Sequence, residues 1–472
     1  MSPTEINQRI AEIDQEIAAL QSSREKGGMY WCNSNAIIQS YNTARSRVLK
    51  TGGALHFRKY EGTGRFVNQI QGGMTVSDLF AGRSGQVSVI PLPENAFTAQ
   101  HRGERRRLCR TFLTVTAFTG RDDEGKHFRR TLRFPMILHR PLPPQARIKE
   151  VHVNAKLEGD TRVWSVTFTL TDELQPPTLA DHPSLAACGI NYGWRQTTGG
   201  IRIATLVSSG GPERAIHHYL PQKLIDRAAY CEQLQGELDE SANEMRALLA
   251  QWDDELPGDS LADSAQPPPE EWSSLVTKAL RSRSVAPLYA LAVAWRAWTD
   301  WHPDKLDTIE EWRRADKRKR LEMEGLRRKA IGHRNDHYRN LAKQIADTFA
   351  IIGIGQLDLK KAAKKKTAPD DADVLPPSAR RIRQLASLST LIEWVEKQAL
   401  KTGALVVEAE RPVTSTCGTC GGKEKIKPDA ISHLCSKCGA VYDRDVNAAL
   451  IAMQDAVMAA MNEASEPKPD AA

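Results

Sequence analysis

The sequence has no long apolar run, and aromatic residues make up only 6% of it. Its most apolar stretch, at 285–295, is interrupted by Pro287 and is shorter than the ~20 residues that a membrane-spanning helix needs. The chain also begins without the basic flank and apolar core of a secretory signal. These absences argue against a helical membrane protein and predict a cytoplasmic location. A length of 472 residues is enough for two or three domains.

Cysteine is scarce, and half of the eight cysteines are isolated from one another. The isolated ones, predicted to be packing residues, are Cys32, Cys109, Cys188 and Cys231. The others form two CxxC pairs, which are Cys417 with Cys420 and Cys435 with Cys438. Disulfides are the alternative, but a reducing cytoplasm and the doubled spacing favour a metal. The four thiolates are therefore predicted to hold one structural zinc ion in a closed tetrahedral site, which leaves nearby His433 out.

The formal net charge is only +7, but positive charge is concentrated in two segments. Residues 97–149 hold 13 Arg or Lys and 4 Asp or Glu, and residues 312–366 hold 17 and 6. The positive electrostatic field of such segments attracts a polyanion such as a nucleic acid. The alternative interpretation is that both runs are ordinary solvated faces.

A helix and then short strands are predicted for the N-terminal part. Apolar residues at helical spacing predict a helix over 4–25. Alternating or β-branched segments then predict a β-rich barrel or sandwich, with strands at 55–57, 87–90, 112–118, 127–138, 148–153 and 163–170. Arginines that alternate along a strand project from one face, which suits contact with phosphate. The arginines assigned to these strands are Arg105, Arg106, Arg107, Arg110, Arg129, Arg130 and Arg133.

The C-terminal part reads as an α/β domain. Predicted strands at 186–190 and 201–207 precede a long helical region, and a strand at 349–359, a helix at 380–402 and a strand at 404–408 follow it. Within the helical region Trp295, Trp298 and Trp301 recur at three-residue spacing. This stripe is predicted to form the core of a helix hairpin and not a platform for stacking bases.

The order of these segments resembles one nuclease lineage. A strand carrying GINYG at 189–193, the strand at 349–359, and the CxxC pairs followed by DRDVNAA at 443–449 occur in the order seen in TnpB proteins and compact type V CRISPR effectors. The Trp194-Arg195 pair, LHFRKYEGTG at 55–64 and LHRPLP at 138–143 resemble most the effectors of the type V-M kind.

The resemblance implies a multidomain α+β fold. Its parts would be an N-terminal helical segment (1–50), a β-rich, barrel-like wedge domain with flanking helices (51–180), a RuvC or RNase H-like α/β domain (186–410) with a helical insertion at about 221–348, a zinc ribbon (411–442), a closing RuvC segment and helix (443–460), and a disordered tail (461–472).

In this lineage three carboxylates of the RuvC site hold two Mg²⁺ ions, which activate water and stabilise the leaving oxygen. The resemblance places Asn191 at the first position, Gly355 at the second (or Gln356 after a shift of one residue), and Asp445 at the third. Because Mg²⁺ is held mainly by anionic oxygens, one carboxylate of three predicts an inactive nuclease with no catalytic residues and no need for Mg²⁺.

Two alternatives concern the acidic residues near this site. One is that Asp358 or Asp443 has moved into it and restores catalysis. The other, which we favour, is that Asp445 is the N-cap of the last helix.

These features predict RNA-guided, sequence-directed binding of double-stranded DNA without cleavage, which would silence a target by blocking transcription or replication. The implied partners are a guide RNA, from a CRISPR locus or a transposon, and a DNA duplex, for a protein encoded by a bacterium or a phage. The strand arginines are predicted to contact nucleic acid. A lysine-rich loop is predicted to do the same through Lys360, Lys361, Lys364, Lys365 and Lys366.

Other functions are compatible with the same sequence. The chain could be an active Mg²⁺-dependent endonuclease with a rearranged site, a decaying transposon remnant, or a guide-directed recruiter of a transposition or transcription partner through the insertion at 257–272. The segment 55–170 leaves little room for a helical recognition lobe. A homodimer, a long structured RNA, or the helices at the ends of the N-terminal region would take the place of this lobe.

Overall fold

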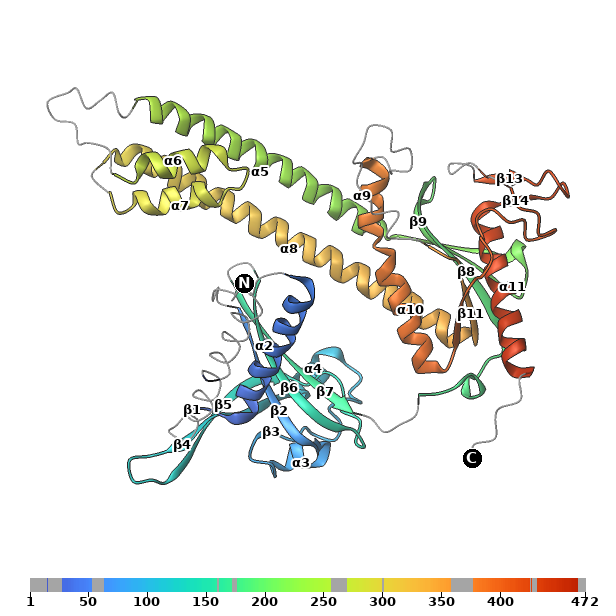
Figure 1. The fold of residues 1–472 in the computed structure, drawn as a ribbon, viewed down its shortest axis with the longest axis horizontal. Helices are drawn as coiled ribbons and strands as arrows, with labels where there is room; N and C mark the ends of the chain where they lie inside the picture. The colour runs from blue at the N-terminus through green and yellow to red at the C-terminus, as the bar shows by residue number, and fades with distance from the viewer. Residues whose placement is uncertain are drawn as a thin grey trace. The chain divides into compact units, whose positions relative to one another are not determined.

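The computed structural model describes residues 28–52, 63–158, 161–171, 176–255, 270–298, 301–357, 377–424 and 431–465, together with residues 15 and 426. The chain divides into two compact units, Met1–Gln175 and Pro176–Ala472. Each unit combines helices and strands (Figure 1). No helix in the described part of the chain is long and apolar enough to cross a membrane.

The N-terminal unit contains two open sheets. In the first, β4 is central, with β5 on one side and with β3 and β1 on the other. In the second, the order is β2-β6-β7. The strands are β1 (Gly28–Met29), β2 (Gly64–Thr75), β3 (Val87–Val89), β4 (Arg110–Arg121), β5 (His127–Ile137), β6 (Arg147–Glu158) and β7 (Thr161–Thr171). Helix α2 (Trp31–Thr51) precedes β2 and ends at Gly52, which adopts the left-handed conformation.

One core joins the two sheets. Leu113 and Val115 of β4 and Val151 and Val153 of β6 are buried in it, and the short helix α3 (Val76–Ala81) adds Leu79. The described strands therefore form a sandwich of two open sheets and do not close into a barrel, so the barrel-like expectation is not confirmed. Alternation of apolar residues defines the buried face of each strand, whereas closure depends on which strands pair, and that information is not local.

Most predicted strands of this unit are present, but three of its arginines were misassigned. Arg105, Arg106 and Arg107 lie on helix α4 (Arg102–Leu108) and not on a strand. Arginine favours helices, and the segment has no β-branched residue, so local propensity accounts for the helix. Arg110 begins β4, and the remaining predicted arginines lie on β5. The predictions at 4–25 and 55–57 fall outside the described residues, apart from residue 15.

The C-terminal unit is built on a five-stranded sheet of order β10-β9-β8-β11-β12. Its strands are β8 (Ala187–Thr197), β9 (Gly200–Ser208), β10 (Ile216–Tyr219), β11 (Ile351–Ile354) and β12 (Leu405–Glu408). β11 pairs in parallel with both β8 and β12, whereas β9 and β10 add as antiparallel strands. The parallel pairs require long crossovers, which the helices between β10 and β12 supply. β10 was not predicted from the sequence.

Helices cover both faces of this sheet (Figure 1). Residues of α8 (Pro303–Thr348) and α10 (Leu388–Thr402) pack in one core with Cys188 and Ile190 of β8. On the opposite face α11 (Arg444–Ser465) crosses β8 and β11. α11 extends to Ser465 and so overlaps the tail predicted from 461; the rest of that tail lies outside the described residues.

A helical arm, formed by α5 (Gln222–Glu255), α6 (Trp272–Arg281), α7 (Ala286–Trp295) and the first part of α8, connects β10 to β11. Its core contains the buried side chains of Trp252, Trp272, Trp295 and Trp301, and Trp298 packs against them. Trp295 donates a hydrogen bond from Nε1 to the carbonyl oxygen of Trp301 at 2.9 Å. The tryptophan stripe is thus a packing core, as predicted.

Two glycines set the distance between α11 and the sheet. Gly189 of β8 and Gly353 of β11 are register partners. A Cβ on Gly189 would lie 1.9 Å from the carbonyl oxygen of Ala449, and a Cβ on Gly353 would lie 2.0 Å from that of Ala452. Both oxygens belong to the backbone of α11, so only glycine permits the helix to lie this close.

We predict that Gly353→Ala lowers the free energy of unfolding by about 3 kcal/mol, because an added methyl group forces α11 away from the sheet. Urea denaturation followed by circular dichroism measures this change. The matched control is Gly325→Ala in α8, where an added Cβ meets no atom within 4 Å. That variant is expected to be more stable by about 0.5–1 kcal/mol. Equal stability of the Gly353 variant and the native protein would contradict the close contact.

Candidate functional site

Four thiols come together in the C-terminal unit. Their sulfur atoms all lie within 4.8 Å of one another, with 3.8 Å between those of Cys417 and Cys438 and 3.7 Å between those of Cys420 and Cys435. Tetrahedral coordination with Zn–S bonds of ~2.3 Å requires sulfur atoms about 3.8 Å apart, so the thiols fit one tetrahedral ion. Burial would raise the pKa of Cys417, but hydrogen bonds from the backbone N–H groups of Cys420 and Thr419 bring it down to about 7. The four predicted ligands therefore form a cluster whose geometry fits one metal ion.

The second CxxC pair lies at the turn of a short hairpin, β13 (Ser432–Leu434) and β14 (Val441–Asp443). Glu424 supports this turn: its carboxylate accepts hydrogen bonds from the backbone N–H of Ser436 at 2.8 Å and from the Ser436 hydroxyl at 2.7 Å. The other carboxylate oxygen lies 2.7 Å from Nε2 of His433. The Ser436 and His433 contacts lower the pKa of Glu424 to about 2. His433 thus contacts the carboxylate of Glu424 and is not part of the thiol cluster.

Asn447 joins α11 to the first CxxC pair. Its Oδ1 accepts a hydrogen bond from the backbone N–H of Gly418 at 2.7 Å, and its Nδ2 donates to the carbonyl oxygen of Thr416 at 2.7 Å. Asn447 is buried. An asparagine amide satisfies both groups at once, whereas an aspartate has no donor for the carbonyl. This accounts for the asparagine two residues after Asp445.

A polar pocket of about 480 Å³ lies where β8, β9 and β11 meet the start of α11. Asn191 and Arg195 line it from β8, Arg202 from β9, and Gln356 from the segment after β11, while Asp445 comes from α11. Residues that are more than 250 positions apart in the sequence, such as Asn191 and Asp445, thus line the same pocket. Asp445 is the one carboxylate among the described residues that line it.

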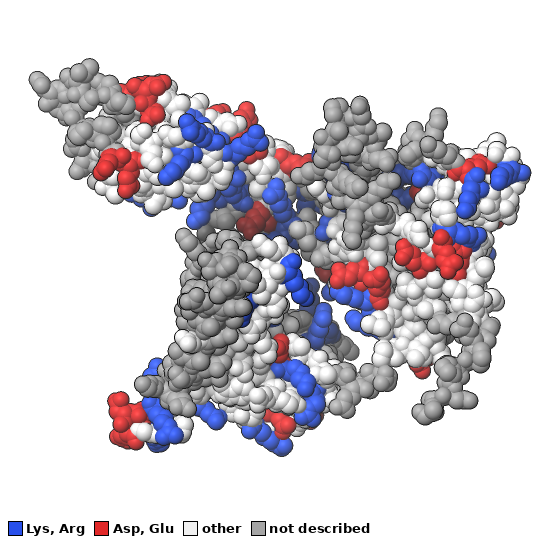
Figure 2. Space-filling view, in the orientation of Figure 1, with Lys and Arg blue, Asp and Glu red and all other residues white. Residues whose placement is uncertain are grey.

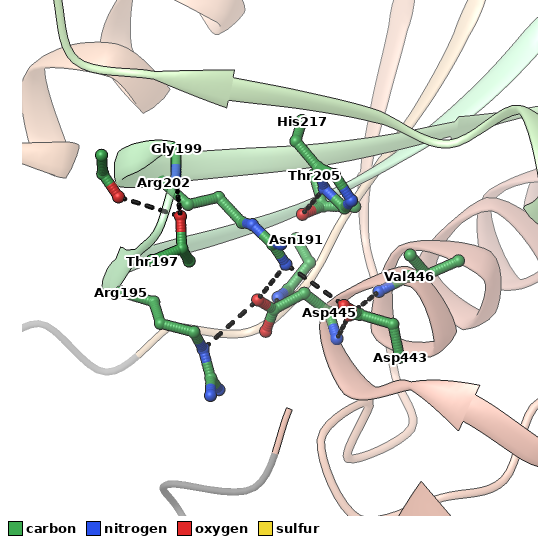
Figure 3. A network of polar contacts seen from close by, with 11 residues as sticks. Asn191, Arg195, Thr197, Gly199, Arg202, Thr205, His217, Asp443, Asp445 and Val446 are labelled. Carbon is green, nitrogen blue, oxygen red and sulfur yellow. Dashed lines mark hydrogen bonds and ion pairs between the residues drawn. The ribbon is translucent and has the colours of Figure 1, made fainter. Parts of the chain in front are cut away.

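Two arginines neutralise Asp445 (Figure 3). Arg202 Nη1 lies 3.1 Å from Oδ2 of Asp445 and 3.3 Å from Oδ2 of Asp443. Arg195 Nε lies 3.5 Å from the same Oδ2 of Asp445, and Asn191 Nδ2 donates to its Oδ1 at 3.3 Å. Arg202 is only 9% exposed, so this pairing is shielded from water.

The charges of this network also shift two pKa values. Burial alone would lower the pKa of Arg202, but hydrogen bonding to Tyr219 and interaction with Asp443 raise it above its usual value. Burial and the charge of Arg202 lower the pKa of His217, which lies 3.0 Å from the hydroxyl of Thr205. Arg202 therefore stays charged at the centre of the network, and the lowered pKa favours the neutral form of His217 beside it.

Asp443, and not Asp445, caps α11. Oδ1 of Asp443 accepts hydrogen bonds from the backbone N–H groups of Asp445 at 2.7 Å and of Val446 at 3.1 Å. These are the bonds of an N-cap, and the helix begins at Arg444. The assignment of Asp445 as N-cap was therefore wrong. Because β14 ends at Asp443, α11 begins two residues earlier than the sequence predicted.

The position after β11 carries no carboxylate. A Cβ on Gly355 would lie 3.5 Å from Oδ1 of Asn191, so Gly355 borders the same space, and Gln356 lines the pocket. Of the two acids considered as replacements, Asp443 is engaged as the helix cap and as a partner of Arg202. Asp358 lies outside the described residues.

Comparisons with known proteins found several similar sequences. A family model described as "Cas12f1-like, TNB domain" matches residues 389–451, which include the four cysteines, Asp445 and Asn447. The CRISPR-associated DNA-binding protein Cas12m of Pelobacter propionicus is 37% identical over 449 residues, which cover 92% of this chain and 65% of that protein. The chain is related to the compact type V effectors. It spans about two thirds of the length of this relative.

Two further known proteins are similar to this chain. The CRISPR-associated DNA-binding protein Cas12m of Thermanaerosceptrum fracticalcis is 27% identical over 448 residues, 94% of this chain and 72% of that protein. Among solved structures, a complex of Cas12f1 with sgRNA and target DNA aligns over 88% of this chain and 69% of that chain, with 10% identity and a TM-score of 0.38.

The seven arginines predicted to contact nucleic acid are all exposed in the N-terminal unit. Two of them lie against aromatic rings: the guanidinium of Arg133 is 4.0 Å from the ring centre of Phe112, and that of Arg130 is 5.5 Å from that of Phe128. Such stacking fixes the planar head group and leaves its N–H groups available to phosphate. The predicted lysines of the 360–366 loop lie outside the described residues.

Three residues of the pocket were missed from the sequence. Arg195 was noted only as part of a motif, and Arg202 and Arg444 were given no role. The signal for Arg202 was available, because it is the one charged residue in the largely apolar strand predicted at 201–207. A charged residue in such a strand indicates a buried ion pair or a site.

Removing one thiolate is expected to release the metal. We predict that Cys435→Ser reduces bound zinc from about one ion per chain to a small fraction, because a structural site requires all four ligands. Inductively coupled plasma mass spectrometry of the dialysed protein measures this. The control is Cys231→Ala, a buried thiol in the helical arm, which is expected to keep its zinc. Full zinc occupancy in the Cys435 variant would exclude the four-thiolate site.

Proposed function

We propose that the chain binds double-stranded DNA at sequences selected by a guide RNA and does not cut it. The observation that carries the proposal is the charge of the pocket. Three carboxylates would be needed there to hold two divalent ions, but Asn191 and Gly355 are uncharged and Asp445 is paired with arginines. The domain around it is proposed to be a degenerate RuvC nuclease domain.

Several further features support binding as the retained activity. The relatives that match most of the chain are named as DNA-binding proteins. The exposed arginines of the N-terminal unit offer contacts to phosphate. Figure 2 shows Lys and Arg side chains along the helical arm of α5 and α8, with Asp and Glu side chains among them. A complex that remains bound after pairing would block a polymerase by its presence, which gives silencing without cleavage.

The thiol cluster is proposed to hold a structural zinc ion. Four thiolates complete a tetrahedral shell and leave no open position for water, so this ion would stabilise the fold and take no part in chemistry. Through Asn447 it would fix the start of α11 against the segment of the first CxxC pair.

The described residues offer less support for the alternatives. An active nuclease with a rearranged site would need Asp443 as a metal ligand, yet this residue caps α11. A recruiter would use the insertion at 257–272, most of which lies outside the described residues. A bacterial or phage origin and a cytoplasmic location remain part of the proposal, as do a homodimer or a long structured RNA in place of a recognition lobe.

Guided binding without cleavage can be tested on the complete chain expressed with its native flanking DNA. We expect a discrete RNA to copurify, with a constant scaffold and a variable end, and the complex to retard a matching DNA duplex in both EDTA and Mg²⁺. Asp445→Asn is expected to leave this affinity within about twofold, because the pocket does not read sequence. A duplex without the matching sequence is the control. Guided nicking by the native protein, abolished in Asp445→Asn, would overturn the proposal.

The proposed loss of a metal site can be tested by adding carboxylates to the pocket. We predict that Asn191→Asp combined with Gly355→Glu gains Mn²⁺ binding that the native chain lacks, because a side chain at 355 points toward residue 191. Electron paramagnetic resonance of free Mn²⁺ measures this binding. Each single substitution is the control and is expected to bind far more weakly. Comparable Mn²⁺ binding by the native protein would show that its site is not degenerate.

A further inference from the structure

Two histidines lie one helical turn apart on α8. His333 and His337 are four positions apart in the sequence, so their side chains leave the helix on the same face. Each ring has a buried nitrogen with no hydrogen-bond partner among the described residues, which is Nδ1 in His333 and Nε2 in His337. Buried polar atoms are nearly always hydrogen-bonded, and a bound ion is one explanation for those that are not.

The backbone of β10 determines which nitrogen of His337 is free. Burial lowers the pKa of His337, and a hydrogen bond to the backbone of Tyr219 opposes that shift, as expected where a ring N–H donates to a carbonyl oxygen. Because Nε2 has no partner, Nδ1 makes this bond and Nε2 keeps its lone pair. Histidines that bind metals are commonly oriented in this way, by a carbonyl oxygen that accepts a hydrogen bond from the other ring nitrogen.

β10 also brings a third imidazole close to this face of α8. Leu220, which follows β10, and Tyr338 of α8 are buried in the same core. Burial lowers the pKa of His218 in β10, and the nearby rings of His337 and His217 lower it further. The lowered pKa values of His218 and His337 favour the neutral imidazole, which is the form that binds metals.

The kind of ligand determines which ion would fit. Imidazole nitrogens suit Zn²⁺, Ni²⁺ and Cu²⁺, whereas Mg²⁺ and Ca²⁺ require oxygen ligands. In the part of the chain that the structure describes, the thiol cluster is the one group of three or more ligating side chains gathered tightly enough to surround a single ion. His333 and His337 therefore offer two protein ligands, and water would complete the coordination. Such a site is weaker than one with four thiolates, and its ion exchanges more readily.

We propose that His333 and His337 chelate one divalent transition-metal ion through their free nitrogens, on the face of α8 that contacts β10, with His218 as a neighbouring imidazole. This site is separate from the four thiols and from the polar pocket at the start of α11. It requires neither a guide RNA nor DNA, so the proposal can fail or hold independently of the proposed function.

Isothermal titration calorimetry with Ni²⁺ tests the proposal on the complete, zinc-loaded chain without a histidine tag. The zinc released is measured, so that exchange at the thiols is counted separately. We expect the native chain to bind about one Ni²⁺ ion, and His333→Asn with His337→Asn to weaken this binding by at least about tenfold. The matched control is His127→Asn with His139→Asn, which removes two exposed imidazoles from the N-terminal unit. It is expected to change the affinity by less than about twofold, because distant sites act independently.

Three results would overturn the proposal. These are no Ni²⁺ binding by the native chain, equal losses in the two double variants, and displacement of Ni²⁺ by excess Mg²⁺, which would indicate oxygen ligands. If the double variant fails to fold, as its zinc content and melting temperature would reveal, His333→Asn alone provides the test, because this ring is only half-buried. Loss of one of the two ligands is expected to weaken Ni²⁺ binding by about tenfold. Unchanged affinity in that variant would contradict the proposal.

Discussion

The close contact between α11 and the central sheet determines where every polar group of the site lies. It depends on Gly189 and Gly353, which face each other across β8 and β11 and leave room for the backbone of the helix. Because the helix rests directly on these strands, its first residues reach the ends of β8 and β11. Asp445 then meets side chains from the sheet, and Asn447 reaches the first CxxC pair.

Ion pairs also stabilise the contact between the start of α11 and the sheet. A carboxylate held in a partly buried pocket needs a positive partner, and here Arg202 provides it from β9 while also contacting Asp443. The same guanidinium therefore connects the helix cap, the first turn of α11 and the sheet. The thiol cluster is attached to this assembly through Asn447, so the cluster and the polar pocket share one short segment of chain.

The sequence predicted what depends on local pattern and missed what depends on pairing in space. The strands of the central sheet and the tryptophan core follow from periodicity, and the four thiols follow from their spacing. The sandwich, the helix containing Arg105, and the choice of Asp443 over Asp445 as the cap all depend on where neighbouring strands end or pair. The partner of Arg202 could not be identified from the sequence, because nothing within its own strand reveals a carboxylate more than 240 residues away.

The pairing of Arg202 with Asp445 also bears on how such a site changes over generations. Substitution of Asn191 by aspartate would place a second carboxylate beside Asp445, which is already paired with arginines. This single change would not complete a site for two divalent ions. A metal site in this pocket would require at least two coordinated substitutions. The internal cations thus separate the pocket from a metal site by more than one mutational step.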